Sequence, residues 1–590
     1  MLDTPSEHSH GTTTRDDGGG HSGRSTSAHS AQSLHASAAP ASEERKRFPI
    51  AFPFIHFMAM APLDAWARLL FAPRAWVPPR YWPRLILSLA ISLLGTLLTL
   101  PERLVLAPIL FVCARTSRRV VPSRGGNRGA VVVLGYFRSG TTHLHYLLTC
   151  DKRFNTPRWS EALVPQGFIF SWNFLRVFLV AFLSTRRPQD DMAFGPEWPA
   201  EDDFAMCNWA TVSSLPGRVI LPRMHEHYKR FHDLDSLTPR EHARWRTYQW
   251  AFLWKLSIVS GGRRLLLKTP CHTARVRDLL QLFGSSKETP GRVKFIHLTR
   301  TPGPVVRSNV SMMDRMSMYH LQDTVPEAEF KRRIIEEYDA TERKFLSQQS
   351  EIPPGDVATM RYEDLIADPM GELKRVYREL GLEWTAQYEV KLLEYLDSVR
   401  EYRSASDKLK GKDASSKGGE AEAAPKELEW MIPAFGHDRP AIPKAPLPVV
   451  GLSSEEQSRR RRIAFWSSGV TAILAGAIWL GLAVAVNNRN DWGVWVVGIA
   501  TGYAAMRTAK VGSIGLGVWA SLVTLLVWLA VAFAATRLIY YRTNIGPTAW
   551  EMWDATQKEI RSGATMPWAI FGILTAYRFA SRKHGGLPGR

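Results

Sequence analysis

The sequence predicts an α/β domain, with a parallel sheet flanked by helices, joined to segments that associate with a membrane. Four short apolar stretches have the character of buried strands, and a helical pattern follows each of them. These stretches are residues 130–134, 264–268, 293–298 and 356–362. Strands that alternate with helices favour a parallel sheet with crossover connections. Long apolar runs outside this region predict the membrane-associated part, at residues 85–101, 463–486 and 511–535.

The first strand leads into a glycine-containing loop and then into a helix. Residues 130–134 are β-branched and apolar, Gly135 and Gly140 bound the loop, and leucines recur at helical spacing in residues 144–148. Backbone N–H groups at the start of a helix have no internal partners, and the helix dipole adds partial positive charge there. We therefore expect this loop to hold a phosphate-like group.

The loop keeps one feature of the nucleotide-hydrolase P-loop and lacks another. That motif is G-x-x-x-x-G followed by Lys and Ser or Thr, and Gly135 and Gly140 have its spacing. Thr141 and Thr142 follow, so the lysine that reaches the β- and γ-phosphates is absent, and Arg138 lies inside the loop instead. The expected fold is therefore P-loop-like. A plain glycine turn between a buried strand and a helix is the simpler alternative.

The loop sequence Gly-Tyr-Phe-Arg-Ser-Gly-Thr-Thr, residues 135–142, resembles the 5′-phosphosulfate loop of the PAPS-dependent sulfotransferases. PAPS is 3′-phosphoadenosine 5′-phosphosulfate. The resemblance implies that this loop binds PAPS as co-substrate, with the threonines offering hydroxyl and backbone donors to the 5′-phosphate. The loop residues expected to contact it are Arg138, Ser139, Gly140, Thr141 and Thr142.

The other predicted strands place polar groups at their carboxyl ends. The second strand ends in Lys268, the third is followed by Arg300, and the fourth ends at Tyr362. In an open parallel sheet, ligands bind beyond the carboxyl ends of the strands. We therefore expect these three side chains to lie along one edge with Arg138.

The resemblance to sulfotransferases spans about residues 80–445 and extends to these strand ends. It implies that Arg300, together with Ser308 eight positions later, holds the 3′-phosphate, and that Tyr362 lies near the adenine. The segments around residues 80–90 and 187–204 resemble the N-terminal apolar helices and the acidic segment of a large subgroup of bacterial and lower-eukaryote enzymes.

The activity that the resemblance implies is transfer of a sulfuryl group from PAPS to a hydroxyl or amine. This chemistry is close to phosphoryl transfer, in which catalysis is mainly positioning and charge stabilisation. Arg138 and Lys268 are the candidates to neutralise the leaving phosphate and the sulfuryl oxygens. An acceptor hydroxyl must also lose a proton to a general base. Glu201 is the first candidate, with Asp202 and His272 as alternatives.

The same residues have simpler interpretations. Glu201 and its acidic neighbours suit the start of a helix, where negative charge is favoured by the dipole, and His272 suits a solvated first turn. Two other functions also stay open. A P-loop kinase or NTPase is disfavoured by the missing loop lysine. A catalytically inactive, nucleotide-binding membrane scaffold is disfavoured by Arg138, Arg300 and Ser308.

Composition limits the partners. We expect no metal site, because the four cysteines lie far apart without paired spacing, at positions 113, 150, 207 and 271. Histidines 8, 10, 21, 29 and 35 lie in a polar tail where disorder is favoured over metal binding. The formal net charge is +20, but the basic residues are scattered, which favours an anionic co-substrate and anionic lipid over nucleic acid. The expected acceptor is a small molecule, a lipid or a glycan.

The membrane segments differ in length. Residues 463–486 and 511–535 are long enough to span a bilayer, whereas residues 492–506 are shorter. Residues 459–462 are four arginines that should stay cytoplasmic, which predicts a multi-pass protein with its catalytic domain in the cytoplasm. Residues 566–579 are too short for an independent span, so the side of the C-terminus stays open. For residues 85–101 we expect helices lying on or dipping into the bilayer.

These observations predict six regions. In chain order they are a disordered tail (1–46), apolar membrane-associated helices (47–128), a sulfotransferase domain (129–445) with a flexible insertion (404–425), a basic linker (446–462), transmembrane helices (463–540), and a C-terminal tail with an interfacial helix (541–590).

Overall fold

The computed structural model describes most of the predicted catalytic and membrane regions. The described residues are 56–116, 129–171, 187, 192, 194–399, 423–446, 454–487, 491–509, 512–540, 548–561 and 566–581. The predicted polar tail with its five histidines lies outside the described residues, as does the predicted insertion except for residues 423–425.

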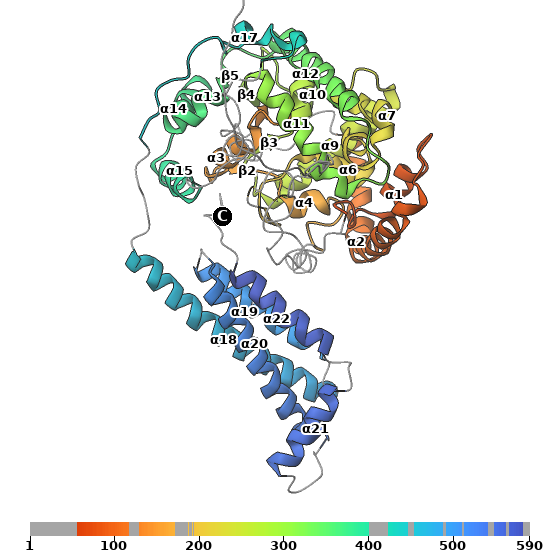
Figure 1. Ribbon diagram of the computed structural model, residues 1–590, viewed down its shortest axis with the longest axis vertical. Coiled ribbons are helices and arrows are strands. Elements are labelled where there is room, and N and C mark those ends of the chain that lie inside the picture. Colours follow the sequence, from red (N-terminus) through yellow and green to blue (C-terminus); the bar gives the residue numbers. More distant parts are fainter. Residues whose placement is uncertain are drawn as a thin grey trace, which may run out of the picture. The chain divides into compact units, whose positions relative to one another are not determined.

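A five-stranded parallel sheet forms the centre of the catalytic domain, in the order β2-β3-β1-β4-β5 (Figure 1). Its strands are β1 (Ala130–Leu134), β2 (Phe154–Asn155), β3 (Arg264–Lys268), β4 (Val293–Thr299) and β5 (Val357–Arg361). All four predicted strands are confirmed, and so is their parallel pairing. The edge strand β2 is not predicted by the sequence, because two residues are too short to carry a periodic signal.

The register of the sheet aligns the carboxyl ends of its strands. Val133 of β1 pairs with Lys268 of β3, and Leu134 pairs with His297 of β4. Thr299, at the end of β4, pairs with Arg361 at the end of β5. The residues that follow β1, β3, β4 and β5 therefore emerge at the same edge, as the sequence predicts for a ligand site.

Helices flank the sheet (Figure 1). The helices of the catalytic domain that carry the following argument are α3 (Thr141–Thr149), α4 (Trp159–Leu163), α6 (Asp202–Ala210), α7 (His225–Tyr228), α9 (Pro239–Val259), α11 (Pro302–Met316), α12 (Glu327–Gln349) and α13 (Tyr362–Ala367). Further helices are α8 (Arg230–Asp233), α10 (Val276–Phe283), α14 (Pro369–Glu379), α15 (Ala386–Ser398) and α17 (Met431–Ala434).

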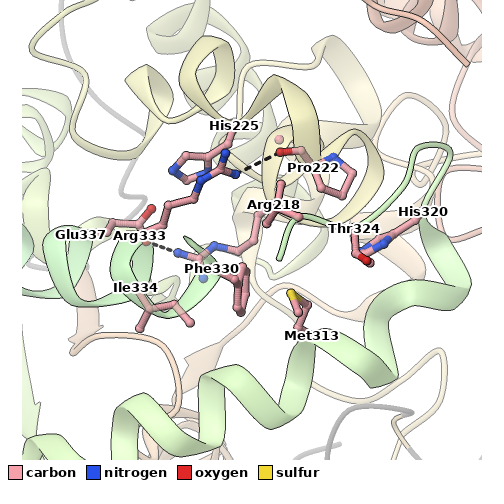
Figure 2. Close-up of a pocket in the computed structure, with 12 residues that line it drawn as sticks. Arg218, Pro222, His225, Met313, His320, Thr324, Phe330, Arg333, Ile334 and Glu337 are labelled. Atoms are coloured by element: carbon pink, nitrogen blue, oxygen red, sulfur yellow. Dashed lines mark hydrogen bonds and ion pairs between the residues drawn. The ribbon is translucent and has the colours of Figure 1, made fainter. Parts of the chain in front are cut away.

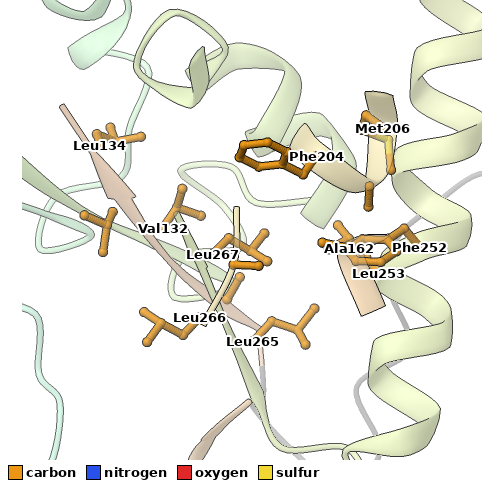
Figure 3. Packing of buried hydrophobic residues seen from close by; sticks show 14 of the residues in the cluster. Val132, Leu134, Ala162, Phe204, Met206, Phe252, Leu253, Leu265, Leu266 and Leu267 are labelled. Carbon is orange, nitrogen blue, oxygen red and sulfur yellow. The ribbon is translucent and has the colours of Figure 1, made fainter. Parts of the chain in front are cut away.

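The hydrophobic core packs α4, α6 and α9 against β1 and β3 (Figure 3). Leu266 and Leu267 of β3 are fully buried, as is Val132 of β1. Met206 of α6 and Phe252 of α9 belong to the same core and are also fully buried. This packing fixes the start of α6, where the acidic residues of the candidate site lie, against the edge of the sheet.

Among the described residues, two α-helices precede the sheet. They are α1 (Leu63–Leu70) and the long helix α2 (Trp82–Thr116), which contains Pro101 and Pro108. Helix α1 packs against α6, and α2 packs against α9.

The C-terminal region is helical. Its helices are α18 (Ser454–Val486), α19 (Gly493–Ala509), α20 (Ile514–Ala535), α21 (Ala549–Arg561) and α22 (Met566–Ser581). Helices α18, α19, α20 and α22 pack on one another. Helices α19 and α22 approach closely at two glycines, since a Cβ added to Gly498 of α19 would lie 2.1 Å from the carbonyl oxygen of Gly572 in α22. Such small-residue contacts are typical of helix packing in membranes.

Within the described part of the chain, three helical segments are long and apolar enough to cross a membrane. They are Pro79–Leu110, Ser458–Val486 and Ile514–Ile539. The last two correspond to the two long spans that the sequence predicts. The shorter stretch at residues 492–506 is helical as part of α19, and residues 566–579 form most of α22. The predicted fold class is confirmed: a P-loop-like parallel sheet, with apolar helices before and after it in the sequence.

Candidate active site

The loop after β1 has an unusual backbone at three positions. Gly135 has a φ of 136° and Gly140 a φ of 102°, and between them Arg138 adopts a φ of 68°. A Cβ on Gly140 would lie 2.3 Å from the ring of Tyr362, at the start of α13. Only glycine allows this close approach, so the loop is pressed against the aromatic ring that the family resemblance places near the adenine.

Hydrogen bonds from three directions hold the loop in this shape. The backbone N–H of Gly135 donates to the Thr273 hydroxyl at 2.7 Å, and the Asn309 amide of α11 donates to the Phe137 carbonyl at 2.9 Å. The Ser139 hydroxyl donates to the Tyr136 carbonyl at 2.7 Å. Ser139, expected to bind the co-substrate, therefore uses its hydroxyl within the loop in this structure.

Four of the predicted co-substrate residues meet beside the loop. Arg138 Nε donates to the Ser308 hydroxyl of α11 at 3.0 Å, and Arg300 Nη1 donates to the Arg138 carbonyl oxygen at 3.3 Å. The Arg300 guanidinium carbon also lies 4.3 Å from the centre of the Tyr362 ring. Two cations, a hydroxyl and an aromatic face thus come together from the ends of β1, β4 and β5 and from α11.

A second group of predicted residues meets at the start of α3. Lys268, at the end of β3, forms an ion pair with Glu201 and donates to the Thr142 hydroxyl at 3.2 Å. Lys268 is buried, while the Glu201 side chain is 13% exposed. The first candidate base therefore touches the lysine expected to stabilise the sulfuryl oxygens.

Arg187 is a residue that the sequence reasoning does not select. Its Nη1 donates to the Thr142 hydroxyl at 3.3 Å, which brings a second cation to the same threonine as Lys268. The only signal for it is its place at the beginning of the segment 187–204 that resembles the family's acidic segment. A single arginine in such a segment would be interpreted as a surface cation, because only the folded structure places it beside α3.

Asp202 and His272 form a buried network behind Glu201. The Asp202 carboxylate accepts hydrogen bonds from Thr269 (2.8 Å), Gln249 (2.6 Å) and His272 Nε2 (2.8 Å). Burial alone would raise the pKa of Asp202, but the neighbouring His272 and the hydrogen bonds hold it below its usual range. His272 is fully buried, and its Nδ1 has no hydrogen-bond partner among the described residues.

This geometry separates the three candidate bases. Glu201 is the N-terminal cap residue of α6 and is partly exposed at the loop. Asp202 and His272 bond to each other inside the protein, where Asp202 accepts three donors. The arrangement favours Glu201 as the group that meets an acceptor, with Asp202 and His272 as residues that position it.

A pocket lies between α7, α11 and α12, and two of its lining residues, Arg218 and Glu337, contact Phe137 and Tyr136 of the loop (Figure 2). It has about 400 Å³ of empty space, part of which is open to solvent. Figure 2 shows Arg218, Arg333 and Glu337 at one end of the pocket. Arg218 forms an ion pair with Glu337 and stacks on the Phe137 ring at 3.9 Å.

Glu337 connects this pocket to the loop. Its carboxylate accepts a hydrogen bond from the Tyr136 hydroxyl at 3.0 Å. Burial alone would raise the pKa of Glu337, but attraction by Arg218 and by two nearby histidines lowers it to about 2. The loop is therefore supported from behind by a buried carboxylate that stays ionised.

Acid should weaken this support. Because the pKa of Glu337 is lower in the folded state than its ordinary value of 4.5, the stabilisation is complete above about pH 5 and is lost as the pH falls towards 2. The shift corresponds to about 3 kcal/mol. We expect Glu337→Gln to lower the thermal midpoint of the detergent-solubilised protein most at pH 7 and least near pH 3. A difference between the two proteins that does not shrink in acid would contradict this assignment.

A family of known proteins matches this part of the chain. The sulfotransferase family model matches residues 130–386, which run from β1 to the start of α15 and include both clusters at the loop. Residues 130–386 are a domain of the sulfotransferase family. Among the described residues, no group of three or more His, Cys, Asp or Glu is arranged to hold a metal ion.

Curated relatives extend the match beyond this domain. The omega-hydroxy-beta-dihydromenaquinone-9 sulfotransferase Stf3 of Mycobacterium bovis is 27% identical over 395 residues, which cover 66% of this chain and 93% of the relative. The Mycobacterium tuberculosis protein of the same name gives the same values. The predicted resemblance to the sulfotransferase family is confirmed.

Two solved structures are also similar. Sulfotransferase STF1 from Mycobacterium tuberculosis has a TM-score of 0.41 at 16% identity, covering 61% of this chain and 93% of its own. Sulfotransferase STF9 from Mycobacterium avium has a TM-score of 0.38 at 16% identity, covering 69% of this chain and 100% of its own.

Proposed function

We propose that this protein is a membrane-anchored sulfotransferase that moves a sulfuryl group from PAPS to a hydroxyl or amine of a lipid-linked or amphipathic acceptor. The observation that carries the proposal is the pair of clusters at one loop. Arg138, Arg300 and Ser308 form the first, and Lys268, Glu201 and Thr142 form the second. A nucleotide with a phosphate at one end and a phosphosulfate at the other needs two such anion sites.

The first cluster fits the adenosine 3′-phosphate end of the donor. Because Arg138 bonds to Ser308, we propose Arg138 for this end, whereas from the sequence we expect it at the sulfuryl oxygens. The Arg138 guanidinium bonds to the Ser308 hydroxyl, and the Arg300 guanidinium bonds to the Arg138 backbone carbonyl. Two cations and a hydroxyl gathered in this way suit a dianion, since charge-assisted hydrogen bonds from arginine are the strong ones. The Tyr362 ring, over which Arg300 lies, offers an aromatic face for a base. The direct Arg138–Ser308 hydrogen bond would open when a phosphate takes the place between them.

The second cluster fits the reacting end of the donor. The start of α3 is a helix N-terminus, where the dipole favours negative charge, and Lys268 and Arg187 flank the Thr142 hydroxyl. These donors would stabilise negative charge on the sulfuryl oxygens and on the leaving phosphate. Sulfate oxygens that engage Lys268 would also compete with Glu201 for the lysine and so free the carboxylate to meet an acceptor.

Glu201 would then accept the proton of the acceptor hydroxyl. The acceptor oxygen forms a bond to sulfur while the bond between sulfur and the phosphate oxygen breaks. The products are the sulfated acceptor, adenosine 3′,5′-bisphosphate and the proton taken up by Glu201. Asp202 and His272 hold the start of α6, so their contribution is to keep Glu201 in place.

Two observations favour an acceptor of lipid character. The curated relatives are named for a hydroxylated menaquinone derivative. The described chain also has three helical segments apolar enough to cross a membrane. We further propose that the catalytic domain faces the cytoplasm, because four consecutive arginines, residues 459–462, precede the apolar part of α18.

Transfer of radiolabel tests the proposed function. Membranes that contain the protein are incubated with PAPS labelled in its sulfate, and lipid, glycan and protein fractions are then separated. We expect label in the lipid fraction, and no label with membranes that lack the protein. Label confined to glycan or protein would change the acceptor class. Bound nucleotide without transfer to any fraction would favour the inactive scaffold, and ATP-dependent phosphate release would favour the kinase or NTPase.

A further inference from the structure

Helix α2 has two faces of opposite character. One face is buried against the rest of the domain and carries Ser88, Ser92, Thr99, Glu102 and Leu106. Steps of four, seven, three and four residues place these side chains in one stripe along the helix. Most of this stripe is polar, whereas a helix surrounded by lipid is apolar on every face.

Polar contacts attach this stripe to the catalytic domain over most of its length. Near the start of α2, Arg84 donates to the His320 carbonyl at 2.7 Å, and Ser92 donates to the Ala61 carbonyl at 2.6 Å. Further along, a Cβ on Gly167 would lie 2.3 Å from the Thr99 side chain. The helix and the domain are therefore packed together closely.

Glu102 is the strongest of these attachments. Its carboxylate is fully buried, and it accepts hydrogen bonds from three consecutive backbone N–H groups, at Ile169 (3.0 Å), Phe170 (2.8 Å) and Ser171 (2.9 Å). It also pairs at 3.1 Å with Lys255 of α9, which in turn donates to the Pro165 carbonyl. Separating a buried carboxylate from this many partners would cost a large amount of free energy.

The opposite face of α2 carries large apolar side chains that project outward. Each of these side chains is 40% to 66% exposed: Ile86, Leu93, Leu94, Leu97, Leu100 and Leu104. A contiguous apolar surface of this kind marks an interaction site. Just before it, Phe71 is 86% exposed, Trp76 is 65% exposed, and Arg74 lies between them in the sequence, also exposed. Aromatic and basic residues together suit the headgroup region of a membrane.

A helix in this setting cannot cross a bilayer. From residue 84 to residue 106, α2 extends about 33 Å at 1.5 Å per residue, which is about the thickness of a hydrocarbon core. Its attached face contacts the catalytic domain at both ends of that length, through Arg84 and Glu102, and contacts Ala61 of the preceding segment between them. If α2 crossed, the parts of the domain that hold Lys255 and His320 would have to enter the hydrocarbon.

We propose that α2 lies in the plane of the membrane interface, with its apolar face in the acyl chains and its polar face holding the catalytic domain on the lipid surface. The occupant of the exposed face is therefore a lipid bilayer. The segment before α2 also reaches the active site, since the Phe57 ring packs on Phe204 of α6, three residues after Glu201. This inference goes beyond the proposed function and stands whichever sulfate donor is used.

Depth measurement on the full chain tests this inference. Single cysteines replace Ile86, Leu97 or Leu104, the protein is reconstituted in vesicles with anionic lipid, and spin labels report their depth. We expect all three labels at the same shallow depth, about 5–10 Å below the phosphates. A matched control is Leu346→Cys, which lies on α12 of the catalytic domain at 37% exposure and should report water. The parental chain supplies the background labelling.

Three outcomes would overturn the inference. If α2 spans the bilayer, Leu97 should lie near the midplane, about 15 Å from either edge of the hydrocarbon core, and Ile86 and Leu104 should lie shallower. If the face is not covered by lipid, all three labels will report water, as at Leu346. If a second copy of the chain covers it, the labels will be shielded from both lipid-soluble and water-soluble relaxers. All labelled positions are exposed, so the substitutions should leave the fold intact.

Discussion

Glu201→Gln is expected to lower kcat by roughly 10²–10⁴-fold, the usual contribution of a positioned general base. Glutamine retains the size of the side chain and can still accept a hydrogen bond from Lys268, but it cannot take up the acceptor proton. In the proposed site Glu201 itself does not contact the nucleotide, so the affinity for adenosine 3′,5′-bisphosphate should stay close to that of the unsubstituted protein. Steady-state transfer and calorimetry measure the two quantities separately.

His272→Asn is the control variant that tests whether Glu201 or His272 is the general base. His272 is buried against Asp202, so its replacement should act through the position of α6 and should lower thermal stability together with turnover. Glu201→Gln should lower turnover with little loss of stability. If Glu201→Gln retains full turnover with normal nucleotide binding, Glu201 is not the base. If His272→Asn instead abolishes turnover without loss of stability, His272 takes that role.

Local signals in the sequence account for the strands and the ligand edge. The strands β1, β3, β4 and β5 are short runs of apolar residues, and their carboxyl ends align because the sheet is parallel. The strand pattern alone therefore suffices to place Arg138, Lys268, Arg300 and Tyr362 at one edge. The resemblance to sulfotransferases supplies Ser308, which no periodic pattern would select.

Tertiary contacts account for what the sequence does not predict. Arg187 donates to Thr142, which lies 45 positions earlier in the sequence, and Glu337 accepts from Tyr136, which lies 201 positions earlier. Contacts between residues so far apart leave no local pattern in the sequence. The sequence suggests a solvated first turn for His272. The turn after β3 instead directs it into the protein, where it meets Asp202. The simpler interpretation, a solvated histidine, is wrong, because His272 is buried beside a partner that lies 70 residues away in the sequence.

Helix α2 also has a feature that the sequence does not reveal. Its mean composition satisfies a membrane-span criterion, yet the buried stripe that holds Glu102 is visible only once α9 and its Lys255 are in place. Hydropathy averaged along a helix does not separate one face from the other. The sequence predicts that residues 85–101 lie on or dip into the bilayer, and the buried stripe of α2 supports the proposal that this helix lies in the interface.

Arg300→Ala is expected to weaken binding of adenosine 3′,5′-bisphosphate by roughly 10–150-fold, which corresponds to the 1.5–3 kcal/mol of a hydrogen bond to a charged group. Ser308→Ala, which removes one neutral hydroxyl, should weaken binding by a smaller factor, roughly 2–10-fold. Isothermal titration calorimetry with the purified protein measures both effects.

Adenosine 5′-monophosphate provides the control, because it lacks the 3′-phosphate. Arg300 also lies over Tyr362 and bonds to the Arg138 carbonyl, so its loss can change the shape of the loop. A change of shape would weaken both nucleotides by similar factors, whereas loss of a 3′-phosphate contact weakens only the bisphosphate. Arg300→Lys keeps the charge but not the two-pronged geometry, and should lie between the alanine variant and the parent. Equal weakening of the two nucleotides in Arg300→Ala would show that the residue shapes the loop and does not read the 3′-phosphate.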